Sequence, residues 1–139
     1  MNQKDKELSF KDLCARLPYH VRVKIWLKDG TTEEGTLDLE HNYADVLRDA
    51  FYYNKIVDIK PYLRSMSSMT EEETKEYRKT QITKWVKSVD CTNGGYYEHR
   101  DTLKTFDWLN AHHFDYRGLI DKGLAIEVTE ENNPYKIAK

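Results

Sequence analysis

The fold is decided by residues 20–30, which read HVRVKIWLKDG. These residues alternate between apolar and polar side chains, which is the period of a strand with one buried face. The apolar side consists of Val21, Val23, Ile25 and Leu27. The polar side consists of Arg22, Lys24, Trp26 and Lys28. Asp29-Gly30 is a strong hairpin-turn signal, so we expect the chain to fold back and pair with this strand.

The segments on either side extend the prediction to a small antiparallel barrel. A short amphipathic helix precedes the strand, capped by Ser9, running over Phe10–Leu17 and ended by Pro18. The further strands are expected over Thr31–Glu40, over Ala44–Arg48 and from Ile56 to about Lys60.

Within the strand predicted over residues 31–40, Leu37 and Leu39 are expected to point inward. Gly35 is expected to mark a bulge or a sharp bend, because glycine inside a strand weakens regular pairing. Pro61 is expected to end the last strand of the barrel.

The second half of the chain is predicted to be mainly helical. Thr70 and Glu73 form a capping box, which starts a long helix expected to reach about Lys87. Asn93-Gly94-Gly95 indicates a turn after it. The remaining predictions are a helix capped by Thr105, a helix capped by Asp115 and stopped by Gly123, a strand over Leu124–Val128 and a loose tail after Glu130.

Together these elements predict the α+β class and a single domain over residues 1–139. Residues 9–64 are expected to form the short helix and a small, strongly bent antiparallel barrel. Residues 70–128 are expected to add a long helix, a helix pair and a short last strand.

Composition restricts the functional class. The 139 residues include 22 basic and 24 acidic side chains, so the net charge of −2 argues against broad, charge-driven binding of nucleic acid, although a local basic patch is compatible with it. A mean hydropathy of −0.84 excludes an integral membrane protein, and 39% hydrophobic residues exclude a disordered chain. Two isolated cysteines, Cys14 and Cys91, and a polar first segment predict a cytoplasmic protein without disulfides.

The first half resembles the Sm-like family of SH3-like barrels. The resemblance lies in Leu27-Lys28-Asp29-Gly30 and Gly35-Thr36-Leu37, which are separated by four residues. It implies a five-stranded barrel after an N-terminal helix, with the second strand bent at its glycine. Glu40 matches the acidic residue of the family's RNA site, but Ala44 stands where the family has asparagine. The Arg-Gly of the second family motif is also absent, so the resemblance implies the barrel without its base pocket.

Two other stretches resemble a family of small proteins from gut Bacteroidales genomes and their prophages. They are Ile59-Lys60-Pro61-Tyr62-Leu63-Arg64-Ser65-Met66-Ser67-Ser68-Met69-Thr70 and Asp107-Trp108-Leu109-Asn110-Ala111-His112-His113-Phe114-Asp115-Tyr116-Arg117-Gly118-Leu119-Ile120. This resemblance implies a cytoplasmic protein carried on mobile DNA, and it brings no activity with it.

The sequence offers two candidate ligand surfaces. The first is the polar side of the leading strand, Arg22, Lys24, Trp26 and Lys28, where a nucleotide ring could stack on the indole while the cations meet phosphate. A solvated outer face is the alternative. The second is Tyr62 and Arg64 with the Ser65–Met69 loop, where hydroxyl and backbone N–H groups could bind an anion. A plain loop and helix cap is the alternative there.

A third candidate surface suits a protein partner. Its residues are Trp108, His112, Tyr116 and Arg117, joined by Phe114. Trp, Tyr and Arg are typical interface residues, but packing of the predicted helix pair explains them equally well. His112 and His113 fit no metal-ligand spacing, so neither a metal nor a cofactor is predicted.

No catalytic motif is present, so no catalytic residue is predicted. The sequence therefore predicts a non-enzymatic, cytoplasmic binding protein, encoded by a phage or mobile element, that sequesters or inhibits a host protein or a nucleotide-like ligand. An Sm-like protein that binds RNA or single-stranded nucleic acid is one alternative, and a small enzyme of unknown class is another. Pairing of barrel edges would make a homo-oligomer.

Overall fold

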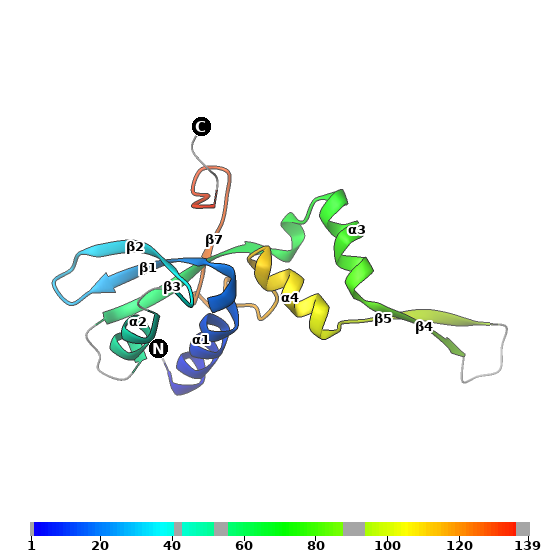
Figure 1. Cartoon of the computed structure of the whole chain (residues 1–139), viewed down its shortest axis with the longest axis horizontal. Helices are drawn as coiled ribbons and strands as arrows, with labels where there is room; N and C mark the ends of the chain where they lie inside the picture. The colour runs from blue at the N-terminus through cyan, green and yellow to red at the C-terminus, as the bar shows by residue number, and fades with distance from the viewer. Residues whose placement is uncertain (1, 41–42, 52–55, 88–93, 136–139) are drawn as a thin grey trace.

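The strand predicted over His20–Lys28 forms β1 (Val21–Leu27) at the centre of the main sheet, in a computed structural model that describes residues 2–40, 43–51, 56–87 and 94–135 (Figure 1). The predicted hairpin turn follows it. The Gly30 N–H donates to the Leu27 carbonyl at 3.1 Å, and the Leu27 N–H donates to the Thr31 carbonyl at 2.9 Å. Gly30 has a φ of +86°, a left-handed conformation that glycine adopts without steric cost.

β1 pairs antiparallel with a strand on each side. The sheet order is β2 (Thr32–Leu37), β1, β3 (Ile56–Ser65) and β6 (Phe114–Asp115), with β7 (Ile126–Glu127) also pairing with β3. β6 and β7 run parallel to β3. The short last strand predicted over residues 124–128 is therefore present, as β7.

Two helices, α1 (Gln3–Arg16) and α2 (Tyr43–Phe51), pack on one face of this sheet (Figure 1). The β1–β3 register pairs Ile25 with Ile59, so alternate residues of both strands face the helices. The core includes Leu13, Val21, Val23, Ile25, Leu37, Leu47, Ile59 and Leu63. Burial of each such side chain is worth about 1.5–3 kcal/mol, which explains why the alternating pattern fixes this part of the fold.

The first helix is longer than predicted, and the third predicted strand is wrong. α1 begins after Asn2, whose side chain accepts from the Asp5 N–H at 2.8 Å, and Ser9 lies buried inside the helix rather than at its cap. After it the chain forms η1 (Leu17–Tyr19), a single 3₁₀ turn. The segment Ala44–Arg48 lies within α2. Its few alternating residues also fit a helical stripe, because a five-residue window cannot separate the two periods.

The described residues form an open sheet and no closed barrel, because the segment expected to supply the third strand is helical. Gly35 pairs in register with Val23, so the bulge predicted there is absent; the irregularity lies between Trp26 and Leu27, against β3. Leu39 lies beyond β2 and is 54% exposed, against the prediction that it points inward.

The second half forms α3 (Glu71–Thr80), β4 (Ile82–Lys87), β5 (Gly95–Arg100) and α4 (Leu103–Ala111), after the 3₁₀ turn η2 (Met66–Ser68). β4 and β5 pair only with each other among the described strands, and Figure 1 shows this hairpin projecting away from the rest of the molecule. The Thr102 and Thr105 hydroxyls both donate to the Thr80 carbonyl, at 2.8 and 3.1 Å. The chain thus leaves α3 and enters α4 at one point.

The predicted capping box at Thr70 and Glu73 is confirmed, but the long helix is not. α3 ends at Thr80, and after Gln81 the residues Ile82–Lys87 form β4 and pair with β5. Of the predicted turn at residues 93–95, Asn93 lies outside the described residues, as does Cys91, and Gly94 has a φ of +95°.

The second helix of the predicted pair is absent. The Asp115 carboxylate accepts from the Leu119 and Ile120 N–H groups, each at 2.9 Å, and this holds a compact turn instead. Gly118 and Gly123 have φ of +75° and +73°, which stop a helix from propagating. The first helix of the pair, α4, is capped by Thr102, with Thr105 as the reciprocal partner rather than the cap.

Residues 131–135 are docked through Tyr135, against the prediction of a loose tail after Glu130; residues 136–139 lie outside the described residues. The Tyr135 hydroxyl donates to the Tyr62 carbonyl at 2.7 Å and accepts from the Arg22 N–H at 3.0 Å. It bridges β1 and β3 next to Pro61, which has no N–H to donate and lies within β3 rather than at its end. The Tyr135 ring stacks on His113 with centroids 3.7 Å apart.

Burial, followed by the nearby Arg16 guanidinium, lowers the pKa of His113 from 6.5 to about 4. The unfolded chain therefore binds a proton at His113 between pH 6.5 and 4 that the folded chain excludes. We expect the free energy of unfolding to fall by about 2 kcal/mol from pH 7.5 to pH 5 on account of this residue. Urea titrations at the two pH values measure it, and His113→Asn, which tolerates the φ of +64°, removes the group. An equal fall in that variant would contradict the assignment.

Candidate functional site

The outer sheet face is the side of the main sheet opposite α1 and α2. By register it consists of Arg22, Lys24, Trp26, Thr32, Glu34, Thr36, Asp58, Lys60 and Tyr62. Three residues predicted from β1 therefore share a face, as expected, and Tyr62 from the second predicted surface joins them beside Arg22. Lys28 lies beyond the end of β1 and is exposed.

Trp26 is the aromatic centre of the outer sheet face. The Lys24 and Lys60 ammonium nitrogens each lie 5.4 Å from the centroid of its ring. Carboxylates stand among these cations: Asp58 lies 3.8 Å from the Lys60 nitrogen, and Glu34 is opposite Lys24 in the β1–β2 register. Charges of both signs are therefore interleaved, which weakens the attraction of this face for a phosphate.

The end of the outer sheet face near Tyr62 is partly closed. The Tyr62 hydroxyl donates to the Glu34 carboxylate, and burial followed by this bond raises the pKa of Tyr62 to about 12. Residues 131–134 of the C-terminal segment line a cavity of about 190 Å³ together with these two side chains. The room left for a ligand is therefore small at this end.

Arg64 does not belong to the outer sheet face. Its guanidinium makes two 2.7 Å hydrogen bonds to the Glu73 carboxylate and lies 4.2 Å from the centroid of the Phe114 ring. The hydrogen bond from Arg64 is the main cause that lowers the pKa of Glu73 to about 2. Ser68 donates to the Ser65 carbonyl at 2.6 Å. Arg64 thus fastens β3 to α3, and the Ser68 hydroxyl is engaged within the turn between them.

The predicted partner surface lies where α4 packs on α1. The Trp108 ring stacks on His112 at 4.1 Å and on Phe114 at 5.7 Å between centroids. The Tyr116 ring receives the Arg16 guanidinium at 5.3 Å and the Arg117 guanidinium at 4.6 Å. These side chains are brought together as predicted, and their contacts are largely internal.

A buried charge network beneath this surface was not predicted. Asp12 and Arg16 are 0% exposed, and the Asp12 carboxylate accepts from Arg16 Nε at 2.8 Å and from Arg117 Nη1 at 2.9 Å. Arg16 Nη2 also donates to the Phe114 carbonyl at 2.7 Å. The signal in the sequence was the i, i+4 spacing of Asp12 and Arg16 beside the apolar stripe of α1.

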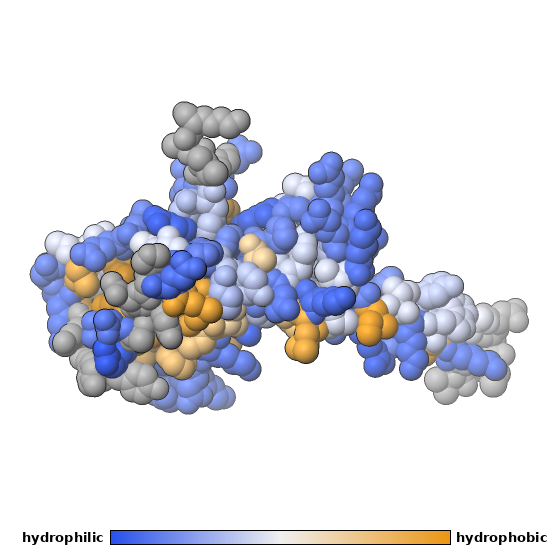
Figure 2. Space-filling view, viewed as in Figure 1, coloured by the Kyte–Doolittle hydropathy of each residue, from blue (hydrophilic) through white to orange (hydrophobic). Residues whose placement is uncertain are grey.

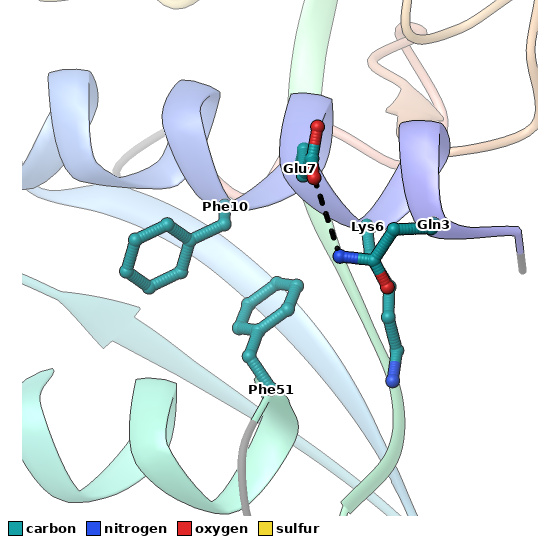
Figure 3. A pocket seen from close by; sticks show the side chains of 5 residues that line it. All are labelled: Gln3, Lys6, Glu7, Phe10 and Phe51. Carbon is teal, nitrogen blue, oxygen red and sulfur yellow. Dashed lines mark hydrogen bonds between the residues drawn. The ribbon is translucent and has the colours of Figure 1, made fainter.

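A shallow cavity of about 160 Å³ lies between α1 and α2 (Figure 3). Phe10 and Phe51 meet edge to face at 5.2 Å in its wall, and the Gln3 amide donates to the Glu7 carboxylate at 3.3 Å across its rim. Lys6 completes the lining. The charges at the rim are of both signs and point to no particular ligand.

The β4–β5 hairpin, called the arm from here on, is the surface that the sequence interpretation missed. Trp85 is 50% exposed and Tyr97 65% exposed, and their rings meet edge to face at 4.9 Å. Tyr96, on the opposite face, is 54% exposed. The β-branched and aromatic residues Ile82, Thr83, Trp85 and Val86 were the available signal for a strand, but the preceding capping box favoured extending the helix through them.

A wide, open cavity of about 570 Å³ lies at the base of the arm. It is lined by Lys79, Thr80, Gln81, Ile82, Thr102, Leu103 and Lys104. Ile82 is 60% exposed and Leu103 is 85% exposed. Figure 2 shows small separate hydrophobic patches where α4 meets the arm, whereas the rest of the arm is pale or blue.

Within the described part of the chain, no three His, Cys, Asp or Glu side chains are grouped so as to hold a metal ion. None of the described helices has the length and apolar character needed to cross a membrane. Comparisons of the chain with protein-family models, with curated proteins and with solved structures find no match.

Proposed function

We propose that the protein is a non-enzymatic binding protein whose α+β body carries the arm as its binding element. The observation that carries the proposal is the exposure of Trp85 and Tyr97 on a hairpin that projects from the body. The contact between the two rings stabilises the hairpin, but a two-stranded hairpin has no second layer to cover the rest of their surface. Aromatic residues left exposed on such an element suit recognition.

The resemblance to proteins of Bacteroidales and their prophages supports a binding protein that is encoded on mobile DNA. A small binding protein on mobile DNA would act on a component of its cytoplasmic host, by sequestering or blocking it. The α1–β1–β2 arrangement supports a relation to Sm-like proteins in the first half of the chain, without the closed barrel. Pairing through the outer edge of β2 would give the homo-oligomer, which native mass spectrometry detects.

Site-specific photo-crosslinking in the host tests whether the arm is the binding element. A crosslinking amino acid is placed at Tyr97 on the arm or at Val57 on the body; both positions are 65% exposed. We expect a discrete crosslinked product from position 97 and none from position 57, because only the arm meets a specific partner. Equal products from both positions, or none from position 97, would overturn the proposal.

A nucleotide-like ligand on the outer sheet face is the second candidate function. It is favoured by the two ammonium groups held 5.4 Å from the centroid of the Trp26 ring. Calorimetric titration with purine nucleotides tests it. Binding heat that disappears in Trp26→Ala but persists in Lys28→Ala would support this candidate, and no heat from any nucleotide would exclude it.

A further inference from the structure

We infer that the arm binds single-stranded nucleic acid, with bases stacked on its aromatic rings and phosphates held by the cations around them. This inference rests on the proposed role of the arm and names the chemistry of its partner. It is drawn from the hairpin register, which places the contacting rings of Trp85 and Tyr97 on one face of the arm and Glu98 on the other.

The two faces of the arm carry the same net charge but differ in where the contacting aromatic rings and the carboxylate lie. The register pairs Trp85 with Tyr97, Thr83 with His99 and Lys87 with Gly95, so these six residues share one face. That face, the aromatic face of the arm, contains a lysine and a histidine and no carboxylate. The one carboxylate of the described arm, Glu98, lies on the opposite face, where Arg100 donates to it at 2.9 Å.

Lys87, on the aromatic face, forms no ion pair with any described residue. Lys84 forms none either, and it lies on the opposite face, across from Glu98. Lys79 and Lys104 line the open cavity at the base of the arm. Over β4 and β5 the described side chains comprise three cations and one carboxylate, although the whole chain has a net charge of −2. The described strands β4 and β5 therefore have a net charge of +2 within a chain whose net charge is −2.

A polyanion fits this pattern better than a protein does. Lysine is depleted at the centres of protein interfaces, whereas a groove or face that combines lysines with exposed aromatic rings is typical of single-strand binding. A single strand is favoured over a duplex because its unstacked bases can lie on Trp85 and Tyr97. The outer sheet face has the same ingredients, but Glu34 and Asp58 stand among its cations.

Fluorescence anisotropy with labelled 20-nucleotide oligo(dT) and oligo(U) tests the inference on the full chain at low salt. We expect binding that weakens with salt, and a slope of log K against log[salt] of about −2 if three phosphates are neutralised. Trp85→Ala combined with Tyr97→Ala should weaken binding by at least about tenfold, given the effect of losing stacked rings. Lys87→Glu should also weaken it, without touching the aromatic pair.

Matched controls are on the body. Phe106→Ala removes a partly exposed aromatic ring on α4, and Lys28→Glu reverses an exposed lysine; both should leave the affinity within twofold of the unmodified protein. Circular dichroism of each variant verifies its fold. The absence of oligonucleotide binding at low salt, binding that survives Lys87→Glu and the double aromatic change, or an equal loss in the body variants would overturn the inference.

The failure of this inference can be told apart from failure of the proposed function. A protein crosslinked from position 97, together with no oligonucleotide binding, would leave the arm as the binding element and overturn its nucleic-acid ligand. Tighter binding of a 20-base-pair duplex than of either single strand would overturn the single-strand assignment. No crosslink from position 97 and no oligonucleotide binding would overturn both.

Discussion

Replacing Asp12 with alanine should lower the free energy of unfolding by about 3–5 kcal/mol, the cost of removing one partner from a buried ion pair. The Asp12 carboxylate is fully buried and accepts hydrogen bonds from two guanidinium groups, those of Arg16 and Arg117. Without it both cations lose their counterion. Arg16 would keep one acceptor, the Phe114 carbonyl, while its buried Nη1 already has no hydrogen-bond partner, so the guanidinium would be left largely unpaired.

Urea denaturation at pH 7.5 measures this effect. The exposed pair of Asp45 and Arg48 on α2 provides the control, because exposed ion pairs are worth about 0–1 kcal/mol. Asp45→Ala should therefore leave the unfolding midpoint nearly unchanged. Adding Arg16→Met to the Asp12 variant should recover part of the loss, since it removes one of the unpaired charges. A loss below 1 kcal/mol in Asp12→Ala would contradict the buried network.

Replacing Phe114 with alanine should cost about 3–5 kcal/mol, as is typical of truncating a buried phenylalanine. Phe114 is 0% exposed, and its ring contacts the Trp108 ring at 5.7 Å and the Arg64 guanidinium at 4.2 Å between centres. It thereby joins α4 to the strand that carries Arg64. The cavity left by truncation would loosen both contacts at once.

Phe106→Ala is the matched control for this prediction. Phe106 also lies in the α4 region and contacts Tyr116 at 5.3 Å, but it is 38% exposed. Its truncation should cost less than half as much, because most of the cost comes from buried surface and cavity volume. Chemical denaturation measures the free energy of unfolding of the two variants. Equal losses of this free energy would contradict the larger contribution expected from the buried Phe114 ring.

Strong local patterns were enough to predict β1, its hairpin turn, the capping box of α3 and the α+β class. Each depends on neighbours within a few residues, such as the Asp29-Gly30 turn or the reciprocal bonds of Thr70 and Glu73. The barrel failed because Ala44–Arg48 is too short for its period to be read. The arm was missed because a good helix start says little about where the helix ends.

The sequence indicated which residue types are suited to binding, but it did not show which of them lie together on one surface. Placing Arg22, Lys24 and Trp26 on one face requires only strand periodicity. The charges that decide what this face attracts, such as Asp58 and Glu34, come from other strands whose register the sequence does not display. The residue types around Trp108 are those of an interface, and they could be read from the sequence. The burial of these side chains could not be read from it, because it depends on contacts with α1, which is distant in the chain.

The threonine contacts between the end of α3 and the start of α4 make residues 81–101 an excursion that returns to its own starting point. Such a segment is an insertion that is attached to the body at one place. Doubling the length of such a segment adds only about 0.6 kcal/mol of loop-closure cost. The arm can therefore be lengthened, shortened or exchanged while Thr80, Thr102 and Thr105 keep α3 and α4 joined. A change in the proposed binding element would therefore leave the fold of the body intact.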